Sequence, residues 1–441
     1  MSAPIPGREG EPPSLVLQEL SEQPDLAASA GLPPAGEPHG IRQAFRALRH
    51  RNFRLFITGQ IVSLIGTWMQ NVAQAWLVYR LTHSEMLLGT AWFCTQVPVF
   101  AFGSLGGLAA DRHSRHRLVV LTQTLSMCQA FALAALTLTG TVQVWQILVL
   151  AAGLGTINAF DMPARQSLII EMTSKDDLLN AISLNSAVFN CARVVGPAIA
   201  GLVVAMVGEG VCFLMNGLSF LAVIGCLLAM RLPKITRTVR DSPWAHLVQG
   251  FRYVNANRAV RTTLGMMGAV TISGMPALVL MPFFADEIFH RGSRGLGVLL
   301  GGMGVGAVVG TVVLAWKARL SGLPKVILWN ALLLGASFCV FAWSNEFYFS
   351  LAIMPLIGYS VMRQLASANT LIQTIIPDEF RGRTMAFYSM TVVGLGPFGS
   401  LAAGALAHAY GTRLTVFAGG LLAILAACVF RFKMKVFREV Q

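Results

Sequence analysis

Residues Gly106 to Leu118 read GGLAADRHSRHRL, and this charged turn lies between two long apolar segments. The rest of the chain has few such groups: 12% of its 441 residues are charged and 55% are hydrophobic. Soluble domains carry about a quarter charged residues. One soluble core could not absorb so much apolar surface, whereas a lipid bilayer can. We therefore predict an integral membrane protein.

Apolar segments long enough to cross about 30 Å of hydrocarbon recur along the chain. They are continuous rather than alternating, which favours helices over the strands of a membrane barrel. The seven cysteines fall inside these segments without paired spacing, so we expect buried thiols rather than disulfides or metal ligands. The predicted fold is all-α with about twelve transmembrane helices, at residues 53–79, 85–110, 117–140, 143–164, 181–207, 211–231, 262–284, 294–316, 326–343, 347–370, 385–409 and 413–431.

Polar stretches divide the chain into parts. Residues 1–40 are rich in Pro, Gly, Glu and Ser and lack periodicity, which predicts a disordered cytoplasmic tail without a cleavable signal peptide. Residues 232–261 are predicted to be a cytoplasmic linker with an amphipathic helix. This linker separates an N-terminal six-helix bundle (41–231) from a C-terminal one (262–431), and a cytoplasmic tail (432–441) follows.

The net charge of +13 is distributed unevenly across the proposed helices. Lysines and arginines collect in the loops on one side, including the turn at Gly106 to Leu118. The other side is predicted to hold only Arg80, Arg291, Arg294 and Arg413. Positive loops remain inside the cell, so both termini are expected to be cytoplasmic, with the protein in the inner membrane of a bacterium. The charges then set topology, and no nucleic-acid partner is expected.

The two predicted bundles resemble each other in sequence. SLIIEMTSKDDLLNAISL from Ser167 matches TLIQTIIPDEFRGRTMAF from Thr370, about 203 residues later. Duplicated six-helix halves are typical of transporters that bind substrate near the midplane between the halves. Small residues on the second and fifth helices of each half predict where the halves slide against each other. These are Gly103, Gly107, Gly196, Gly201, Gly302, Gly306, Gly310, Gly396, Gly399 and Gly404.

The opening turn, from Gly107 to Arg117, resembles motif A of the major facilitator superfamily, with Ser114 in place of a second glycine. NAFDMPARQSLI at Asn158, ARVVGPAIAG at Ala192 and GTWMQNVAQAWLVYRLTHS at Gly66 resemble the bacterial efflux branch of that superfamily. That branch includes enterobactin-type siderophore exporters and macrolide efflux proteins. The resemblance covers nearly the whole chain beyond residue 40, and it implies two pseudo-symmetric six-helix bundles.

The resemblance also implies roles for two motifs. In motif A, Asp111 would latch the two halves together, with Gly107 in the turn and with Arg112 and Arg115 as charge partners. The alternative is a solvated loop that only sets topology. The segment Gly196, Pro197 and Gly201 resembles motif C of antiporters. An ordinary membrane-helix kink is the alternative there.

Charged residues inside the apolar segments are candidates for a proton or charge relay. A charge in the membrane is costly, so it usually marks a transport pathway or an ion pair. Arg193 lies near the midplane of the fifth helix, and Arg363 lies in the tenth. Asp161 could be the partner of Arg193 or a proton acceptor; an ion pair with Arg165, one turn away, is the alternative. The candidate cavity residues, which could instead be interhelical hydrogen-bonding groups, are Gln70, Asn71, Gln74, Asn185 and Asn190.

These observations predict a secondary transporter that exports a small drug-like or siderophore-like molecule by alternating access, in exchange for protons. We expect a monomer in the lipid bilayer, with no catalytic residues, cofactor or metal site. Exposed histidines such as His113 and His116 are more often solvated than metal-bound, and no nucleotide loop or hydrolase motif is present. The alternatives are an importer or lipid flippase of the same fold, or a transport-inactive scaffold or sensor.

Overall fold

The computed structural model of the protein describes residues 45–231, 251–316 and 322–437. Within these ranges the chain is helical and contains no strand. The predicted disordered tail (1–40) and most of the predicted linker (232–250) lie outside the described residues. The last residues of that linker are described, and 251–256 are helical.

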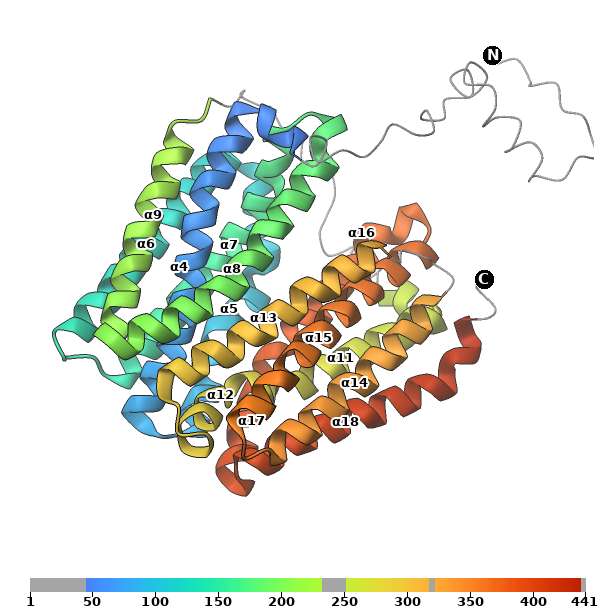
Figure 1. The fold of residues 1–441 in the computed structure, drawn as a ribbon. Helices are drawn as coiled ribbons and strands as arrows, with labels where there is room; N and C mark the ends of the chain where they lie inside the picture. Colours follow the sequence, from blue (N-terminus) through green and yellow to red (C-terminus); the bar gives the residue numbers. More distant parts are fainter. Residues whose placement is uncertain (1–44, 232–250, 317–321, 438–441) are drawn as a thin grey trace, which may run out of the picture. The chain divides into compact units, whose positions relative to one another are not determined.

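The N-terminal half forms a bundle of six long helices (Figure 1). After a short 3₁₀ turn at Arg46–Arg49, they are α4 (Arg51–Thr82), α5 (Glu85–Arg112), α6 (Arg115–Leu138), α7 (Val144–Met172), α8 (Leu178–Val207) and α9 (Glu209–Leu228). Local sequence explains several ends. Ser84 and Ser114 accept hydrogen bonds from the first turns of α5 and α6, as N-cap serines do. Gly208, with φ of 86°, allows the sharp reversal between α8 and α9.

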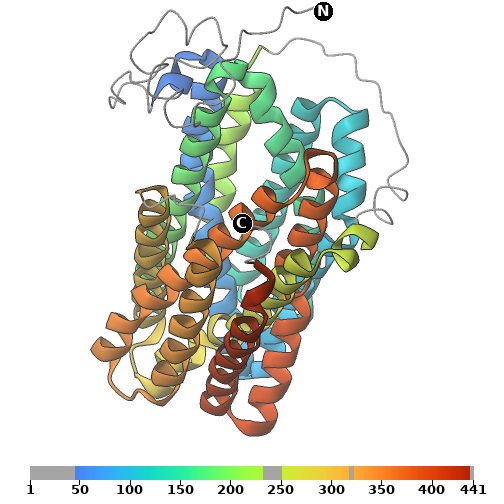
Figure 2. The same cartoon turned by 90° about the vertical axis from the view of Figure 1, so that its right-hand side faces the viewer.

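The C-terminal half forms a second bundle, which lies beside the first in Figure 1 and partly overlaps it in the turned view of Figure 2. It comprises α11 (Arg258–Val279), α12 (Met281–Phe283), a π-helical turn (Phe284–Ile288), α13 (Gly292–Trp316), α14 (Leu323–Trp343), α15 (Phe347–Ile375), α16 (Asp378–Gly394), α17 (Gly396–Tyr410) and α18 (Thr412–Lys433).

Two details of this half differ from the sequence-based expectation. The eleventh predicted helix is interrupted at Leu395, because Pro397 begins a new helix and cannot donate a backbone hydrogen bond to the preceding turn. The tail expected from residue 432 begins later, since α18 continues to Lys433 and a 3₁₀ turn follows to Phe437. Phe437 is buried against Phe430, with ring centroids 5.5 Å apart, and this contact holds the turn in place.

Eleven helical spans among the described residues are long and apolar enough to cross a membrane. The helix α4 is not among these spans because it carries several buried amides, although it is 32 residues long and packs along α8 and α9. Large apolar side chains such as Leu179 and Phe432 are exposed on the outside. An apolar exterior around a bundle with buried polar groups fits a lipid-embedded protein.

The internal duplication is visible in the lengths of the helices. Both α7 and α15 are 29 residues long, and each end of α15 lies 203 residues after the corresponding end of α7. The two helices occupy equivalent places, because α7 packs on α5 and α6 as α15 packs on α13 and α14. Position 161 therefore corresponds to position 364.

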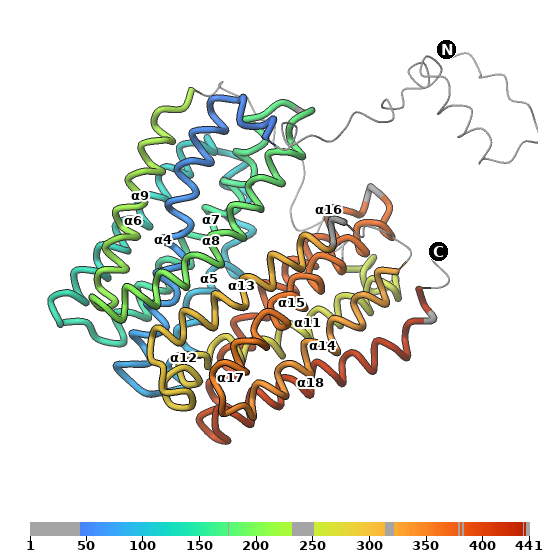
Figure 3. Tube along the Cα trace, viewed as in Figure 1, coloured from blue at the N-terminus to red at the C-terminus, as the bar shows by residue number. Residues whose placement is uncertain are grey.

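The two halves meet along two helix pairs, α8 with α13 and α5 with α17. The Cα trace shows α8 running beside α13 (Figure 3). At the first pair, a Cβ on Gly201 would lie 2.7 Å from Ser293 O and 2.8 Å from Gly297 Cα. At the second pair, a Cβ on Gly89 would lie 3.1 Å from Gly404 Cα. These contacts confirm that the second and fifth helices of each half form the seam.

The glycines predicted for this seam do not all face it. Those at Gly302, Gly306 and Gly310 pack against α15 of their own half, and Gly399 packs against α11. Gly103 and Gly107 have open space around them. The face of α13 that meets α8 carries Gly297 and Gly304 instead. With glycines on more than one face of α13, sequence spacing could not decide which face meets the other half.

Candidate functional site

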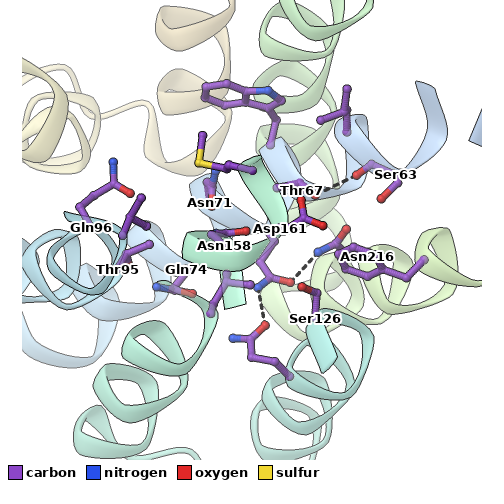
Figure 4. Close-up of a pocket in the computed structure, with 18 of the residues that line it drawn as sticks. Ser63, Thr67, Asn71, Gln74, Thr95, Gln96, Ser126, Asn158, Asp161 and Asn216 are labelled. Atoms are coloured by element: carbon purple, nitrogen blue, oxygen red, sulfur yellow. Dashed lines mark hydrogen bonds between the residues drawn. The ribbon is translucent and has the colours of Figure 1, made fainter. Parts of the chain in front are cut away.

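A polar cavity of about 270 Å³ lies inside the N-terminal half (Figure 4). Its wall draws on all six helices of that half, from Ser63 on α4 to Asn216 on α9. Trp68, Trp92 and Phe189 add apolar surface to a lining that is otherwise rich in amides and hydroxyls. A concave site with aromatic walls and a few converging polar groups is the usual form of a small-molecule site.

Asp161 is the acidic residue in the wall of this cavity, and its side chain is 3% exposed. Thr122 Oγ1 and Gln123 Nε2, both from α6, donate to Asp161 Oδ1 over 2.7 and 2.9 Å. Arg165 Nε lies 3.2 Å from Asp161 Oδ2, and Arg165 Nη1 donates to Gln60 Oε1. Every partner of Asp161 is a donor, so the surroundings are arranged for a carboxylate.

A chain of amides crosses the floor of the same cavity. Asn216 Nδ2 donates to Gln70 Oε1 over 2.7 Å, and Gln70 Nε2 donates to Gln129 Oε1 over 2.9 Å. Ser219 Oγ donates to Asn216, and Gln129 Nε2 lies 3.4 Å from Leu150 O. The chain therefore joins α4, α6 and α9 and fixes the orientation of the amides toward the cavity.

The structure brings only some of the predicted cavity residues together. Gln70 and the next residue, Asn71, line the cavity together with Gln74 one turn later on α4. Figure 4 shows Asn71 and Gln74 at its wall. Asn185 and Asn190 on α8 do not line it, and Asn190 Nδ2 instead donates to Ser186 O in its own helix.

Sequence reasoning missed several lining residues that come from helices other than α4. They are Gln123, Ser126 and Gln129 on α6, Asn158 on α7 and Asn216 on α9. Their signal was present: each is a polar residue in an otherwise apolar membrane segment, and on α6 the three recur every third position.

Arg193 does not pair with Asp161. Its guanidinium carbon lies 5.5 Å from the ring centre of Trp68 and 5.3 Å from that of Phe189, and its Nε has no hydrogen-bond partner. Because these two rings line the cavity, Arg193 lies behind the aromatic wall. Arg363 lies in the other half, so the structure does not join it to Asp161 or Arg165 either.

The motif A residues lie at the end of α5 and the start of α6. The side chain of Asp111 is 61% exposed and lies 3.5 Å from Arg115 Nη2. Arg115 also pairs with Glu171 on α7, at 3.1 Å, and thereby ties this turn to its own half. Arg112 is exposed. The glycine contacts of α5 with α16 and α17 lie nearer the start of α5, at Gly89 and Phe100.

Motif C lies at the seam. The helix α8 continues through Pro197, and Pro197 O would lie 2.7 Å from a Cβ on Gly297 of α13. Gly201 meets the same glycine, whereas Gly196 faces Trp68 and Ile65 of α4. The motif therefore allows α8 to approach both its own half and the other half closely.

Two smaller cavities continue from the polar cavity into the C-terminal half. One of about 110 Å³ shares Trp92 and Gln96 with it and reaches Met275 and Val392. The other small cavity, of about 130 Å³, shares Met275 and Val392 with the 110 Å³ cavity. Its lining is almost wholly apolar, with methionines at positions 267, 275, 281 and 303. The three form a row from Asp161 in one half to a methionine-lined space in the other.

An unexpected polar contact joins the halves at the end of α4. The hydroxyl of Tyr79 donates to Asp286 Oδ2 over 2.8 Å and lies 3.3 Å from Glu287 Oε1, both in the π-helical turn. His83 Nδ1 lies 3.8 Å from Glu287 Oε1. This end of α4 is opposite the end of the bundle that carries Asp111, so the halves are fastened on the side away from motif A.

Comparison with known proteins agrees with this arrangement. A family profile described as "Transmembrane secretion effector" matches residues 42–441. The staphyloferrin A transporter of Staphylococcus aureus is 25% identical over 383 residues, covering 86% of this chain and 95% of the relative. The multidrug efflux pump Tap of Mycolicibacterium fortuitum is 25% identical, covering 85% and 94%. The enterobactin exporter EntS of Shigella boydii is 21% identical, covering 76% and 80%.

Solved structures show the same fold. A bacterial homologue of the human lysosomal transporter Spinster, inward-facing and unoccupied, aligns with a TM-score of 0.68 at 14% identity, covering 91% of this chain and 99% of that one. An inward-facing bacterial homologue of ferroportin aligns with a TM-score of 0.67 at 17% identity, covering 87% and 98%. The chain therefore belongs to the transmembrane secretion effector family of the major facilitator superfamily, and it is a multi-pass membrane transporter rather than an enzyme.

Proposed function

We propose that the protein exports a small organic molecule by alternating access, driven by protons that bind Asp161. The observation that carries the proposal is a buried carboxylate in the wall of the polar cavity, paired with Arg165 and reached by hydroxyl and amide donors. Two of the relatives are named as a multidrug efflux pump and an enterobactin exporter, which supports export as the direction, and a third is named as a staphyloferrin A transporter.

The hydrogen bonds of Thr122 suggest how protonation is accommodated. Thr122 Oγ1 has one proton and two acceptors within reach, Asp161 Oδ1 at 2.7 Å and Val119 O at 2.9 Å. When Asp161 is ionised, the hydroxyl donates to the carboxylate. When Asp161 is protonated, the hydroxyl can turn to Val119 O and accept from the acid instead. Protonation of Asp161 also removes the negative partner of Arg165. The charge in the cavity wall then depends on the proton, so binding of the substrate in the cavity is coupled to binding of the proton.

The contacts between the halves support the alternating part of the proposal. The contacts of Tyr79 with Asp286 and of Gly89 with Gly404 hold the halves together on one side. On the other side Gly107 has open space around it, and Asp111 is 61% exposed with its ion pair to Arg115 of the same half. The arginine-rich turn beside Asp111 favours a cytoplasmic position for that side, because positively charged loops tend to remain inside the cell. The structure then corresponds to a state open toward the cytoplasm, and Asp111 would latch the halves in the opposite state. Both termini would be cytoplasmic, and the protein would act as a monomer.

Two substitutions are expected to shift this equilibrium in opposite directions. Tyr79→Phe removes a hydrogen bond to a carboxylate worth about 1.5–3 kcal/mol, and should favour the outward-open state. Asp111→Asn removes the latch charge, worth about 0.3–2 kcal/mol at a helix terminus, and should favour the inward-open state. Distances between spin labels on the two halves, measured in nanodiscs, report the shift. Shifts in the same direction for both variants would contradict alternating closure.

The proposal as a whole is tested with the full chain in proteoliposomes. An imposed pH gradient should drive at least one compound from a panel of cationic dyes, neutral drugs and siderophores, and dissipating the gradient should stop that movement. A matched preparation with bovine serum albumin in place of the transporter controls for leakage. If a compound crossed the membrane at the same rate with and without the pH gradient, proton coupling would be contradicted. If no compound in the panel crossed, export itself would be contradicted.

A further inference from the structure

A second group of buried polar residues lies in the C-terminal half, outside the polar cavity. Seven of the eleven buried side-chain atoms without a hydrogen-bond partner in the described residues belong to it. They are Ser360 Oγ, Arg363 Nε and Nη1, both amide atoms of Gln364, Ser367 Oγ and Thr384 Oγ1. Arg363 is 7% exposed and the other four residues are fully buried. We refer to these five residues as the Arg363 cluster.

Four members of the cluster lie on the same side of one helix because of helix geometry. Ser360, Arg363, Gln364 and Ser367 are spaced three and four residues apart, which places them on one side of α15. Thr384 lies one turn before Tyr388, whose hydroxyl donates to Leu365 O over 2.8 Å and so holds that side of α16 against α15.

The corresponding place in the N-terminal half carries a carboxylate. Gln364 corresponds by the duplication to Asp161, whose carboxylate is paired with Arg165 one turn later. Around Arg363 the residue one turn earlier is Tyr359, whose ring centre lies 5.8 Å from the guanidinium carbon. No carboxylate among the described residues pairs with Arg363. A buried guanidinium without a counter-ion is costly, and an anion bound here would offset that cost.

The neighbourhood indicates which anion. One guanidinium neutralises a single negative charge, which fits a carboxylate better than a doubly charged phosphate. The adjoining residues Ile357, Val361 and Leu365 line the apolar, methionine-rich cavity of about 130 Å³. We propose that the Arg363 cluster binds the carboxylate of an organic anion whose apolar part occupies this cavity. Only the identification of that anion as the exported compound rests on the proposed function.

The test measures binding, which requires no transport. The full chain in nanodiscs is heated with benzoate or with its neutral analogue benzamide, and unfolding is followed with a thiol-reactive dye that reports buried cysteines such as Cys212. Benzoate should raise the melting temperature saturably, and benzamide should not. Arg363→Met should weaken benzoate binding about tenfold or more, because a charge-assisted hydrogen bond is lost.

A second variant keeps the test decisive if Arg363→Met fails to fold. Ser360→Asp supplies a carboxylate about one turn before Arg363, so it should raise stability without ligand and abolish the benzoate effect. Arg193→Met, which changes another buried arginine in the other half, should leave benzoate binding unchanged. Equal responses to benzoate and benzamide, or a benzoate response that survives both cluster variants, would overturn the proposal.

Discussion

Asp161→Asn is expected to abolish accumulation driven by a pH gradient while leaving exchange of substrate across the membrane without a gradient. Asparagine keeps the size of the side chain and can still accept from Thr122 and Gln123, so the cavity retains its shape. An asparagine side chain cannot take up or release a proton, so the pH gradient can no longer drive transport through this position. The assay compares gradient-driven uptake with counterflow of the compound that the wild-type protein moves fastest.

The ion pair with Arg165 provides the control for a purely structural effect. Removing one partner of a fully buried pair costs about 3–5 kcal/mol, and the 23% exposure of Arg165 should keep the cost below that. The double variant Asp161→Asn with Arg165→Gln removes both charges and should recover most of the lost stability. Gradient-driven uptake should remain absent in it. Recovery of uptake together with stability would show that Asp161 serves only the packing of α6 and α7.

Gly358→Ala is expected to destabilise the C-terminal half strongly. A Cβ at Gly358 would overlap the carbonyl oxygen of Met303 on α13 and lie 3.0 Å from Ala307 N, so the two helices would have to separate. Overpacking of this kind costs about 1–3 kcal/mol or more, since backbone cannot rotate away as a side chain can. Thermal unfolding and the yield of monodisperse protein measure the effect.

Gly153→Ala is the matched control, because it makes the same change at a helical glycine with nothing within 4 Å. It should be neutral or stabilising by up to about 1 kcal/mol, owing to the better helix propensity of alanine. If both variants lost stability equally, tight packing of α13 on α15 would not be the reason that position 358 is glycine.

The fold could be predicted closely because its determinants are local. The length of each apolar segment follows from the thickness of the hydrocarbon, and α7 and α15 carry their duplication in their own sequences. For the candidate site, the residues could be predicted only on α4, where several amide side chains lie close together in the sequence. Gln70 was found on α4, but its partners Gln129 and Asn216 come from α6 and α9, which read simply as apolar segments.

The amino-acid sequence by itself determined that this is a duplicated, multi-helix membrane protein, the approximate positions of its helices, and that Asp161 and Arg165 lie one turn apart. The tertiary structure decided which charges meet. It gave Asp161 its donors on α6 and placed Arg193 behind Trp68 and Phe189, and within the part of the chain that it describes it gave Arg363 no carboxylate partner. The reason is that helix length depends on the residues of one segment, whereas the rotation of a helix about its axis depends on how it packs against its neighbours.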